Sequence, residues 1–150
     1  MKSIITFVLL FVSIVSFSQN EEQEQVIESV NIFFAGFHTQ DSTLIKSVVY
    51  KDVVMQSVGV NKEGETQLYS SNFSDFLKQI VSIPEDNTFL ENLLSYSVQI
   101  DGNMANVWTP YEFWYNDQKS HCGVNSFQLI KENDTWKIIY LVDTRRKCEE

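Results

Sequence analysis

The sequence predicts an α+β fold in which N-terminal helices pack on a strongly curved, mostly antiparallel sheet. Apolar residues recur at helical spacing before residue 50 and again over residues 73–81. From residue 93 onward the period changes to two, and turn-forming residues interrupt it at 101–103, 116–117 and 133–134. Strands joined by such short turns pair with one another, so the helices are expected to gather on one face of the sheet.

Three helices are expected. The segment 21–38 has one wide apolar face, formed by Val26, Ile27, Val30, Phe33, Phe34 and Phe37. Asp41 is expected to cap a second, short helix carrying Leu44, Ile45, Val48 and Val49. The third helix carries Phe73, Phe76, Leu77, Ile80 and Val81. Its cap is expected at Ser70, Ser71 or Asn72, and Pro84 closes the run.

Five strands are expected, one before the third helix and four after it. The first is rich in β-branched residues, and the whole set covers residues 52–60, 95–100, 104–115, 119–131 and 135–146. Strands much longer than the usual five or six residues indicate a bent sheet. Pro110 lies inside one of these long strands and predicts a bulge at that point.

Residues 1–18 have the pattern of a secretory signal peptide, with a basic start at Lys2, an unbroken apolar middle and small residues at Ser16 and Ser18. The apolar run is shorter than the roughly 20 residues of a membrane-spanning helix. Cleavage is expected before Gln19, which is not the cysteine that lipoproteins acylate. We therefore expect an exported, periplasmic or secreted protein that leaves the membrane after cleavage, with residues 19–150 as a single domain.

The charge balance disfavours polyanionic partners. The formal net charge is −9, and loss of Lys2 with the signal peptide makes it about −10. Nucleic acid and anionic membranes are therefore not expected as partners. The only basic cluster is the short run Arg145, Arg146 and Lys147 near the chain end.

The positions of the two cysteines argue against a disulfide, although an exported chain could form one. In the expected last hairpin, Cys122 lies opposite Thr144 or Arg145, which leaves Cys148 three or four residues too far along the chain unless the tail folds back. We therefore expect a buried, unpaired Cys122. Neither cysteine has metal-ligand spacing.

Several common site motifs are missing from the sequence. It has only two histidines and no HxH or HExxH spacing, so no metal is expected. It also has no GxGxxG, Walker-type, GxSxG or CxxCH motif. No cofactor is expected, and nucleotide-dependent, serine-hydrolase and haem functions are disfavoured.

Three motifs in this order of elements carry a family resemblance. They are the W-x-x-Y-x-F run ending at Phe113, the HCGVNSF run at 121–127, and the W-K-I and D-T-R-R runs between 136 and 146. In these features the chain resembles the nuclear transport factor 2-like superfamily, and within it the exported SnoaL-like, or lumazine-binding, branch. The resemblance implies a cone-shaped, cystatin-like roll with a cavity, a function that ranges from isomerase, dehydratase or cyclase to binding without catalysis, and a homodimer.

The resemblance also gives two ways to read the polar residues. Isomerase-type members use a tyrosine and an aspartic acid with an aspartate base, whereas this chain offers His121, Asn125, Asp143 and Tyr111. Dehydratase-type members use two histidines with an aspartate and tyrosines. In this chain the same residue types are found at His38 and His121, at Asp41 or Asp143, and at Tyr111. His38 and Asp41 are also explained as a helix-end histidine and a helix cap.

Strand register decides which polar residues share a face. In the hairpin around residues 116–117, Phe113 lies opposite His121 and Tyr111 opposite Gly123. If residue numbers in the last hairpin sum to 266, Asp143 faces Gly123 on the same side; with a sum of 267 it turns away. The first register allows a His121–Asp143 dyad, and the second leaves His121 as a structural strand histidine.

The preferred interpretation is a pocket that binds a small cyclic or aromatic molecule. The expected lining is Phe33, Phe37, Tyr111, Phe113, His121, Asn125 and Phe127. The first alternative is a proton-transfer enzyme whose catalytic residues are His121, Asp143, Asn125 and Tyr111. The second is an interaction module that dimerises through Trp108 and Trp114 on the outer sheet face.

Overall fold

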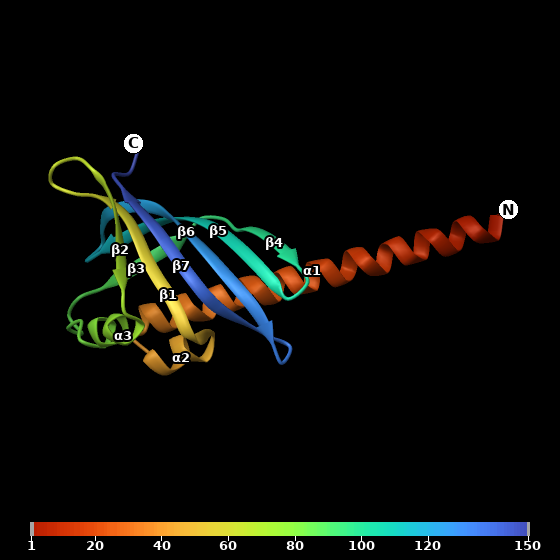
Figure 1. Ribbon diagram of the computed structural model, residues 1–150, viewed down its shortest axis with the longest axis horizontal. Helices are drawn as coiled ribbons and strands as arrows, with labels where there is room; N and C mark the ends of the chain where they lie inside the picture. Colours follow the sequence, from red (N-terminus) through yellow and green to blue (C-terminus); the bar gives the residue numbers. More distant parts are fainter. Residues whose placement is uncertain (1, 150) are drawn as a thin grey trace.

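A computed structural model describes the backbone of residues 2–149 and the side chains of residues 20–149. One curled sheet wraps around the end of a long helix (Figure 1). The predicted α+β class, with N-terminal helices against a strongly curved sheet, is confirmed. The signal peptide predicted at 1–18 lies outside the residues whose side chains are described, and it stays a prediction.

The structure contains three helices and seven strands within the described residues. The helices are α1 (Lys2–His38), α2 (Ser42–Ser47) and α3 (Phe73–Val81). The strands are β1 (Val49–Val60), β2 (Thr66–Ser71), β3 (Phe89–Leu93), β4 (Ser97–Asp101), β5 (Met104–Tyr115), β6 (Gln118–Glu132) and β7 (Thr135–Arg146). Their order in the sheet is β2-β1-β7-β6-β5-β3, with β4 also paired to β5. Only β1 and β7 run parallel among the paired strands of the described chain.

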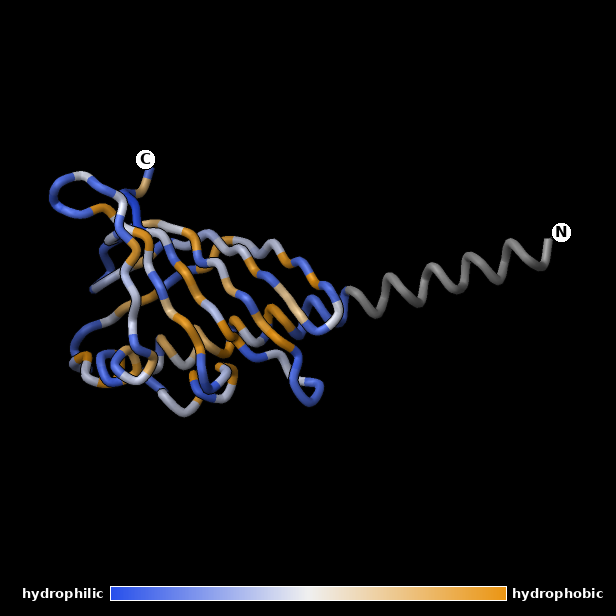
Figure 2. Tube along the Cα trace, in the orientation of Figure 1, coloured by the Kyte–Doolittle hydropathy of each residue, from blue (hydrophilic) through white to orange (hydrophobic). Residues whose placement is uncertain are grey.

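The predicted apolar face of α1 forms the core against the inner face of the sheet. Val26, Val30, Phe33 and Phe34 are buried there at helical spacing. Hydrophobic and hydrophilic residues alternate along the strands (Figure 2). The inward residues of β5 and β6, among them Val107, Phe127 and Leu129, are completely buried beneath the helix.

Local turn chemistry sets the hairpins. Asn116 and Asp117 both have positive φ, as do Asn133 and Asp134, which fits two-residue turns between twisted strands. Asp41 caps α2 by accepting from the backbone N–H groups of Thr43 and Leu44. Asn72 caps α3 in the same way. These parts of the sequence prediction are confirmed.

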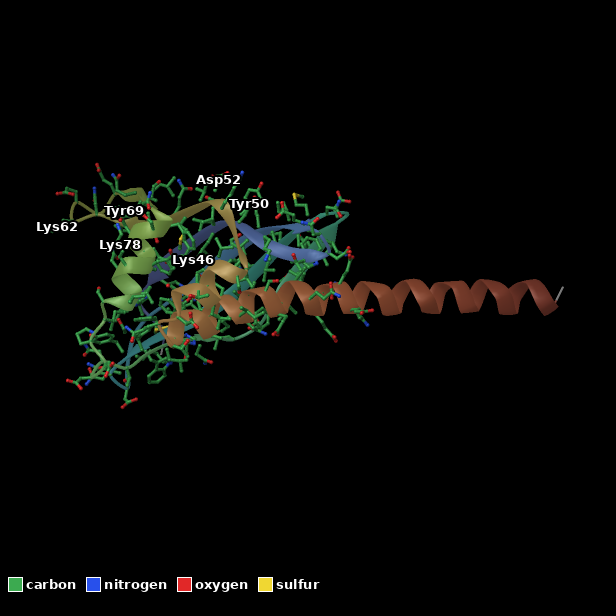
Figure 3. All side chains as sticks on the ribbon, turned by 90° about the horizontal axis from the view of Figure 1, so that it is seen from below. Lys46, Tyr50, Asp52, Lys62, Tyr69 and Lys78 are labelled. Carbon is green, nitrogen blue, oxygen red and sulfur yellow. A yellow bond between two sulfur atoms is a disulfide. The ribbon has the colours of Figure 1, made fainter. Side chains whose placement is uncertain are left out.

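Two strands were not predicted. β2 is exposed along its whole length, and it pairs only with β1 to make a hairpin that carries Lys62 in its connecting turn (Figure 3). β3 has five residues and contains a glutamate. α2 also ends at Ser47, so Val49, expected in that helix, instead begins β1.

The bulge expected at Pro110 was misplaced. Pro110 pairs with Val124 in regular register, and the irregularity between β5 and β6 lies between Phe113 and Trp114. The carbonyl of Pro110 accepts from Leu94, which follows β3. The N–H and C=O of a strand residue point to the same side, so an N–H at Pro110 would point away from β6. On that side residue 110 lies between the residues of β5 that pair with β3 and those that pair with β4. The proline therefore costs no hydrogen bond to β6.

A bulge in the last hairpin decides the direction of Asp143. Near the turn, Leu129 pairs with Ile138, but beyond it Gln128 pairs with Tyr140, which leaves Ile139 as an extra residue in β7. Asn125 consequently pairs with Asp143. The predicted register with a sum of 267 holds between the turn and the bulge, but beyond the bulge the sum is 268, so neither predicted register holds at Asp143. Asp143 nevertheless lies on the inner face.

Cys122 and Cys148 form a disulfide with a Cα–Cα distance of 5.0 Å, so the expectation of an unpaired Cys122 was wrong. The same bulge explains the difference. It moves the partner of Cys122 to Arg146, and Cys148 is then only two residues beyond that partner. The disulfide ties the chain end to β6, next to the strand positions that hold Asp143 and Arg145.

Candidate functional site

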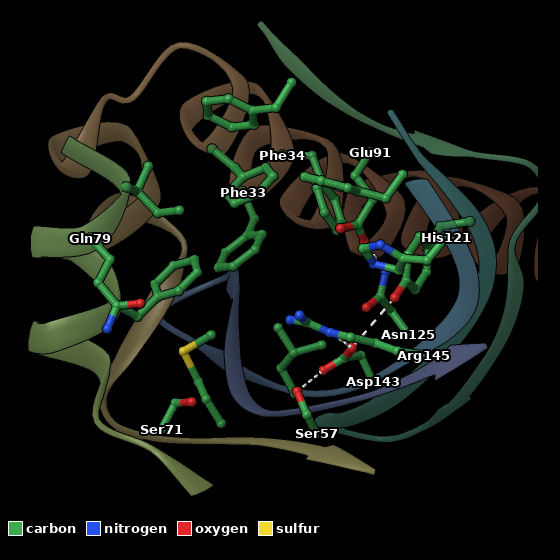
Figure 4. Close-up of a pocket in the computed structure, with 18 of the residues that line it drawn as sticks. Phe33, Phe34, Ser57, Ser71, Gln79, Glu91, His121, Asn125, Asp143 and Arg145 are labelled. Atoms are coloured by element: carbon green, nitrogen blue, oxygen red, sulfur yellow. Dashed lines mark hydrogen bonds and ion pairs between the residues drawn. The ribbon is translucent and has the colours of Figure 1, made fainter. Parts of the chain in front are cut away.

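A cavity of about 280 Å³ lies between the helices and the inner face of the sheet (Figure 4). α1, α3 and β3 supply most of its apolar wall, and β5, β6, β7 and β1 supply most of its polar groups. Its lining comprises Phe33, Phe34, Phe37, Met55, Gln56, Ser57, Ser71, Phe76, Gln79, Ile80, Ile83, Phe89, Glu91, Tyr111, Phe113, Tyr115, His121, Asn125, Leu141, Asp143 and Arg145.

Phenylalanine rings form the apolar side. Phe37 stacks on Phe76 with ring centroids 6.2 Å apart and meets Phe89 edge-on at 5.1 Å. Phe33 also stacks on Phe76 at 6.2 Å. On the opposite side, Phe113 stacks on the His121 imidazole at 4.9 Å. Flat apolar walls of this kind complement a ring better than a flexible chain.

Glu91 is the central acidic group of the polar side. Its Oε1 accepts from Asn125 Nδ2 at 2.6 Å, and Asn125 is itself buried. Burial of the carboxylate raises the pKa of Glu91 to about 7, and nearby Asp143 adds to the rise, while the Asn125 hydrogen bond and Arg145 oppose it. This carboxyl group therefore changes its protonation near neutral pH.

Asp143 belongs to a separate hydrogen-bonded cluster. It accepts from the Ser57 hydroxyl on the adjacent parallel strand and from Arg145 Nε at 3.2 Å. The Tyr111 hydroxyl donates to the Thr144 carbonyl at 3.0 Å and lies 3.4 Å from Asp143 Oδ2. Burial and the adjacent Glu91 and Asp143 raise the pKa of Tyr111, so it stays a phenol.

His121 and Asp143 both line the cavity, but no hydrogen bond joins them among the described residues. The imidazole Nδ1 lies 3.2 Å from the Ser120 hydroxyl instead. Burial lowers the pKa of His121, Arg145 lowers it further, and Asp143 opposes both. The imidazole is therefore neutral at physiological pH, and the geometry of an aspartate-oriented dyad is not formed.

His38 supports the site from outside. Its Nε2 accepts from the backbone N–H of Glu91 at 2.9 Å and so satisfies the free edge of β3. Burial lowers the pKa of His38, which keeps that nitrogen able to accept. His38 and Asp41 are not cavity-lining residues; they serve as a strand-edge contact and a helix cap.

The structure places six of the seven predicted lining residues at the cavity, namely Phe33, Phe37, Tyr111, Phe113, His121 and Asn125. Phe127 is completely buried and packs edge-on against Phe33 and Phe34, so it belongs to the core beneath the cavity. Sequence reasoning missed Glu91, Ser57 and Arg145. Glu91 could have been found from the sequence, because it lies between Phe89 and Leu93 in a run of alternating residues, at a position where an apolar residue is expected.

The described residues contain no group of three or more histidine, cysteine or acidic side chains arranged to hold a metal. Within the same part of the chain, no helix is both long and apolar enough to cross a membrane.

Comparison with protein-family models gives no match, and comparison with curated proteins gives none either. Solved structures do match. A protein of unknown function from Mycobacterium tuberculosis has a TM-score of 0.69 at 12% identity, covering 89% of this chain and 76% of that one. An NTF2-like protein of unknown function from Pseudomonas putida KT2440 scores 0.68 at 9% identity, covering 87% and 91%.

A third match, from Streptomyces avermitilis, is described as a proposed dehydratase of the NTF2-like family. Its TM-score is 0.66 at 14% identity, and the match covers 87% of this chain and 99% of that one. The chain therefore has the nuclear transport factor 2-like, or cystatin-like, fold. At these sequence identities the similarity shows the fold alone, and the activity has to be inferred from the residues of the cavity.

Proposed function

We propose that this protein binds a small, partly apolar, cyclic or aromatic molecule in the cavity. The observation that carries the proposal is a partly open cavity with phenylalanine rings on one side and Glu91, Asn125, His121 and Asp143 on the other. Its volume of about 280 Å³ is just below the roughly 300–1,000 Å³ that is typical of ligand pockets. One or two fused rings with a polar substituent suit that size.

Blocking the cavity should abolish binding without unfolding the protein. Ser71 is exposed and lines the cavity, so Ser71→Trp should place an indole in the cavity space at small cost to folding. We expect two-ring probes such as 2-naphthalenemethanol to raise the melting temperature of the wild type. In Ser71→Trp the shift should be much smaller, corresponding to a probe affinity at least about tenfold lower.

Leu68→Trp is the matched control, because Leu68 is an exposed residue of β2 that points to the opposite face of the strand from Ser71 and is not part of the cavity lining. It should keep wild-type binding. Equal binding by both variants, or no binding of any two-ring probe to the wild type, would contradict the proposed site.

A second candidate function is proton transfer to or from a carbonyl compound, favoured specifically by the Glu91 carboxyl group with its pKa of about 7. Glu91 replaces His121 as the candidate base, because the His121–Asp143 contact is not formed. Asn125 holds one oxygen of Glu91 and so orients the group.

The test of this candidate is deuterium exchange at the α-carbon of 2-tetralone, followed by NMR in heavy water. Exchange catalysed by the wild type should rise as Glu91 ionises through neutral pH and disappear in Glu91→Gln. A wild-type rate equal to that of buffer would leave binding as the function of the cavity.

Export and a homodimer belong to the same proposal. Trp108 on the outer sheet face has an exposed fraction of 50%, which fits a contact surface, whereas Trp114 is partly covered by Lys119, whose Nζ lies 5.2 Å from the indole. These properties support Trp108 more than Trp114 as a residue of the proposed dimer contact.

A further inference from the structure

One oxygen of Glu91 has no hydrogen-bond donor within residues 20–149, whose side chains the structure describes. Oε1 accepts from Asn125 Nδ2, but no hydrogen bond among the described residues reaches Oε2. An ionised carboxylate has about four acceptor positions and binds donors strongly. The carboxyl lines the cavity, so a bound molecule is well placed to supply the missing donor.

The protein also supplies little compensating positive charge. Arg145 is the cation of the cavity lining, but its Nε donates to Asp143, and its side chain has an exposed fraction of 64%. Asp143 and Arg145 therefore largely cancel each other. The negative charge of Glu91 is left without a dedicated partner, which agrees with a pKa raised to about 7.

The other groups around Glu91 add no cation. His38 on α1 accepts a hydrogen bond from the Glu91 backbone, and burial lowers its pKa, so it is neutral near pH 7. His121 on β6 has a lowered pKa for the same main reason. Tyr111 on β5 stays a phenol, and Ser57 on β1 is committed to Asp143.

Aromatic side chains neighbour this carboxyl group in the cavity lining. Phe89 lies two residues from Glu91 on the same face of β3, and Phe113 pairs with Glu91 across the sheet. Aromatic rings attract cations through their negative faces, and the attraction is larger where water is excluded. An anionic group among aromatic rings thus favours a cation attached to an apolar body.

We propose that the cavity selects a small aromatic compound carrying a protonated amine, whose ammonium group donates to Glu91 Oε2 while its ring packs among Phe37, Phe76 and Phe89. This inference rests on the proposed binding function and names the class of ligand. Binding is linked to pH, because the ammonium pairs with the ionised form of Glu91. Alkyl ammonium groups stay charged up to about pH 9, so the change between about pH 6 and 8 reports on the carboxyl group.

The test compares three probes of similar shape, 2-naphthylmethylamine, 2-naphthalenemethanol and 2-naphthoate, by isothermal titration with the purified protein. With a pKa of about 7, the ionised fraction of Glu91 rises about tenfold from pH 6 to pH 8. We expect the affinity of the amine to rise about tenfold over that range, and to exceed that of the alcohol about tenfold at pH 8. The naphthoate should bind least.

Glu91→Gln keeps an oxygen that accepts from Asn125 and removes the charge. We expect this variant to lose the amine preference and its pH dependence while still binding the alcohol. Glu112→Gln is the control, because Glu112 pairs with Lys119 at 2.7 Å and is not part of the cavity lining. It should behave as wild type.

The outcomes separate the two proposals. If the alcohol or the naphthoate binds the wild type as well as the amine does at pH 8, the amine proposal is overturned and the binding function stands. If no probe binds, both are overturned. The pH series on wild-type protein decides the amine proposal even if Glu91→Gln folds poorly.

Discussion

Gly123→Ala is expected to destabilise the fold strongly, although it adds only one methyl group. A Cβ at residue 123 would overlap the Thr144 carbonyl oxygen of β7 and lie 2.7 Å from the ring and hydroxyl of Tyr111. Tyr111 is directly opposite Gly123 in the sheet, and both residues are buried. Backbone on one side and a packed ring on the other leave no direction in which the methyl can be accommodated.

We expect a loss of about 3 kcal/mol in the free energy of unfolding, measured by urea titration, which corresponds to roughly 10 °C in melting temperature. Gly59→Ala is the matched control. Its Cβ would lie 3.2 Å from the ring of Tyr69, an exposed side chain that is free to move. A loss for Gly123→Ala no larger than that for Gly59→Ala would show that Tyr111 does not lie over Gly123.

Glu91→Gln is expected to stabilise the protein at alkaline pH, although it removes a charged group with a hydrogen-bond partner. The pKa of Glu91 is about 7 in the folded protein, against an ordinary value of 4.5. The folded state therefore holds a proton that the unfolded state has lost over that interval. The contribution of Glu91 to the free energy of unfolding therefore falls as pH rises from about 4.5 to 7 and levels off above that range.

The difference of about 2.5 in pKa corresponds to roughly 3 kcal/mol. Relative to wild type, Glu91→Gln should gain up to that amount of stability by about pH 8 and nothing near pH 4.5, in urea titrations at a series of pH values. Glu112→Gln should follow the wild-type slope between about pH 5 and 8, because the hydrogen bond from Lys119 lowers the pKa of Glu112 from its ordinary value, so Glu112 stays ionised over that range. Parallel curves for wild type and Glu91→Gln would contradict the placement of Glu91 in the cavity.

The sequence predicted most of the sheet because its turns are chemically distinctive. Asn116-Asp117 and Asn133-Asp134 adopt the left-handed backbone that such residues tolerate, so the bounds of β5 and β7 could be read directly. β2 and β3 escaped detection because β2 has no buried face and β3 is short. Their positions depend on pairing with β1 and β5, and pairing across a sheet leaves little trace in one sequence.

A single extra residue limited the prediction of the site. Ile139 bulges out of the ladder between β6 and β7, and that bulge shifts Asp143 opposite Asn125 and brings Cys148 within reach of Cys122. A one-residue register shift cannot be derived from hydrophobic alternation, because the bulge lets alternation hold on both sides of it. The contact of Glu91 with Asn125 joins residues 34 positions apart and follows only from the curvature of the sheet.

The most direct test of the account is a high-resolution crystal structure of the protein grown with 2-naphthylmethylamine at about pH 8. We expect density for the ring among Phe37, Phe76 and Phe89, with the amine nitrogen within hydrogen-bond distance of Glu91. A cavity closed by those rings, with Glu91 paired to Arg145 and the probe absent, would contradict it.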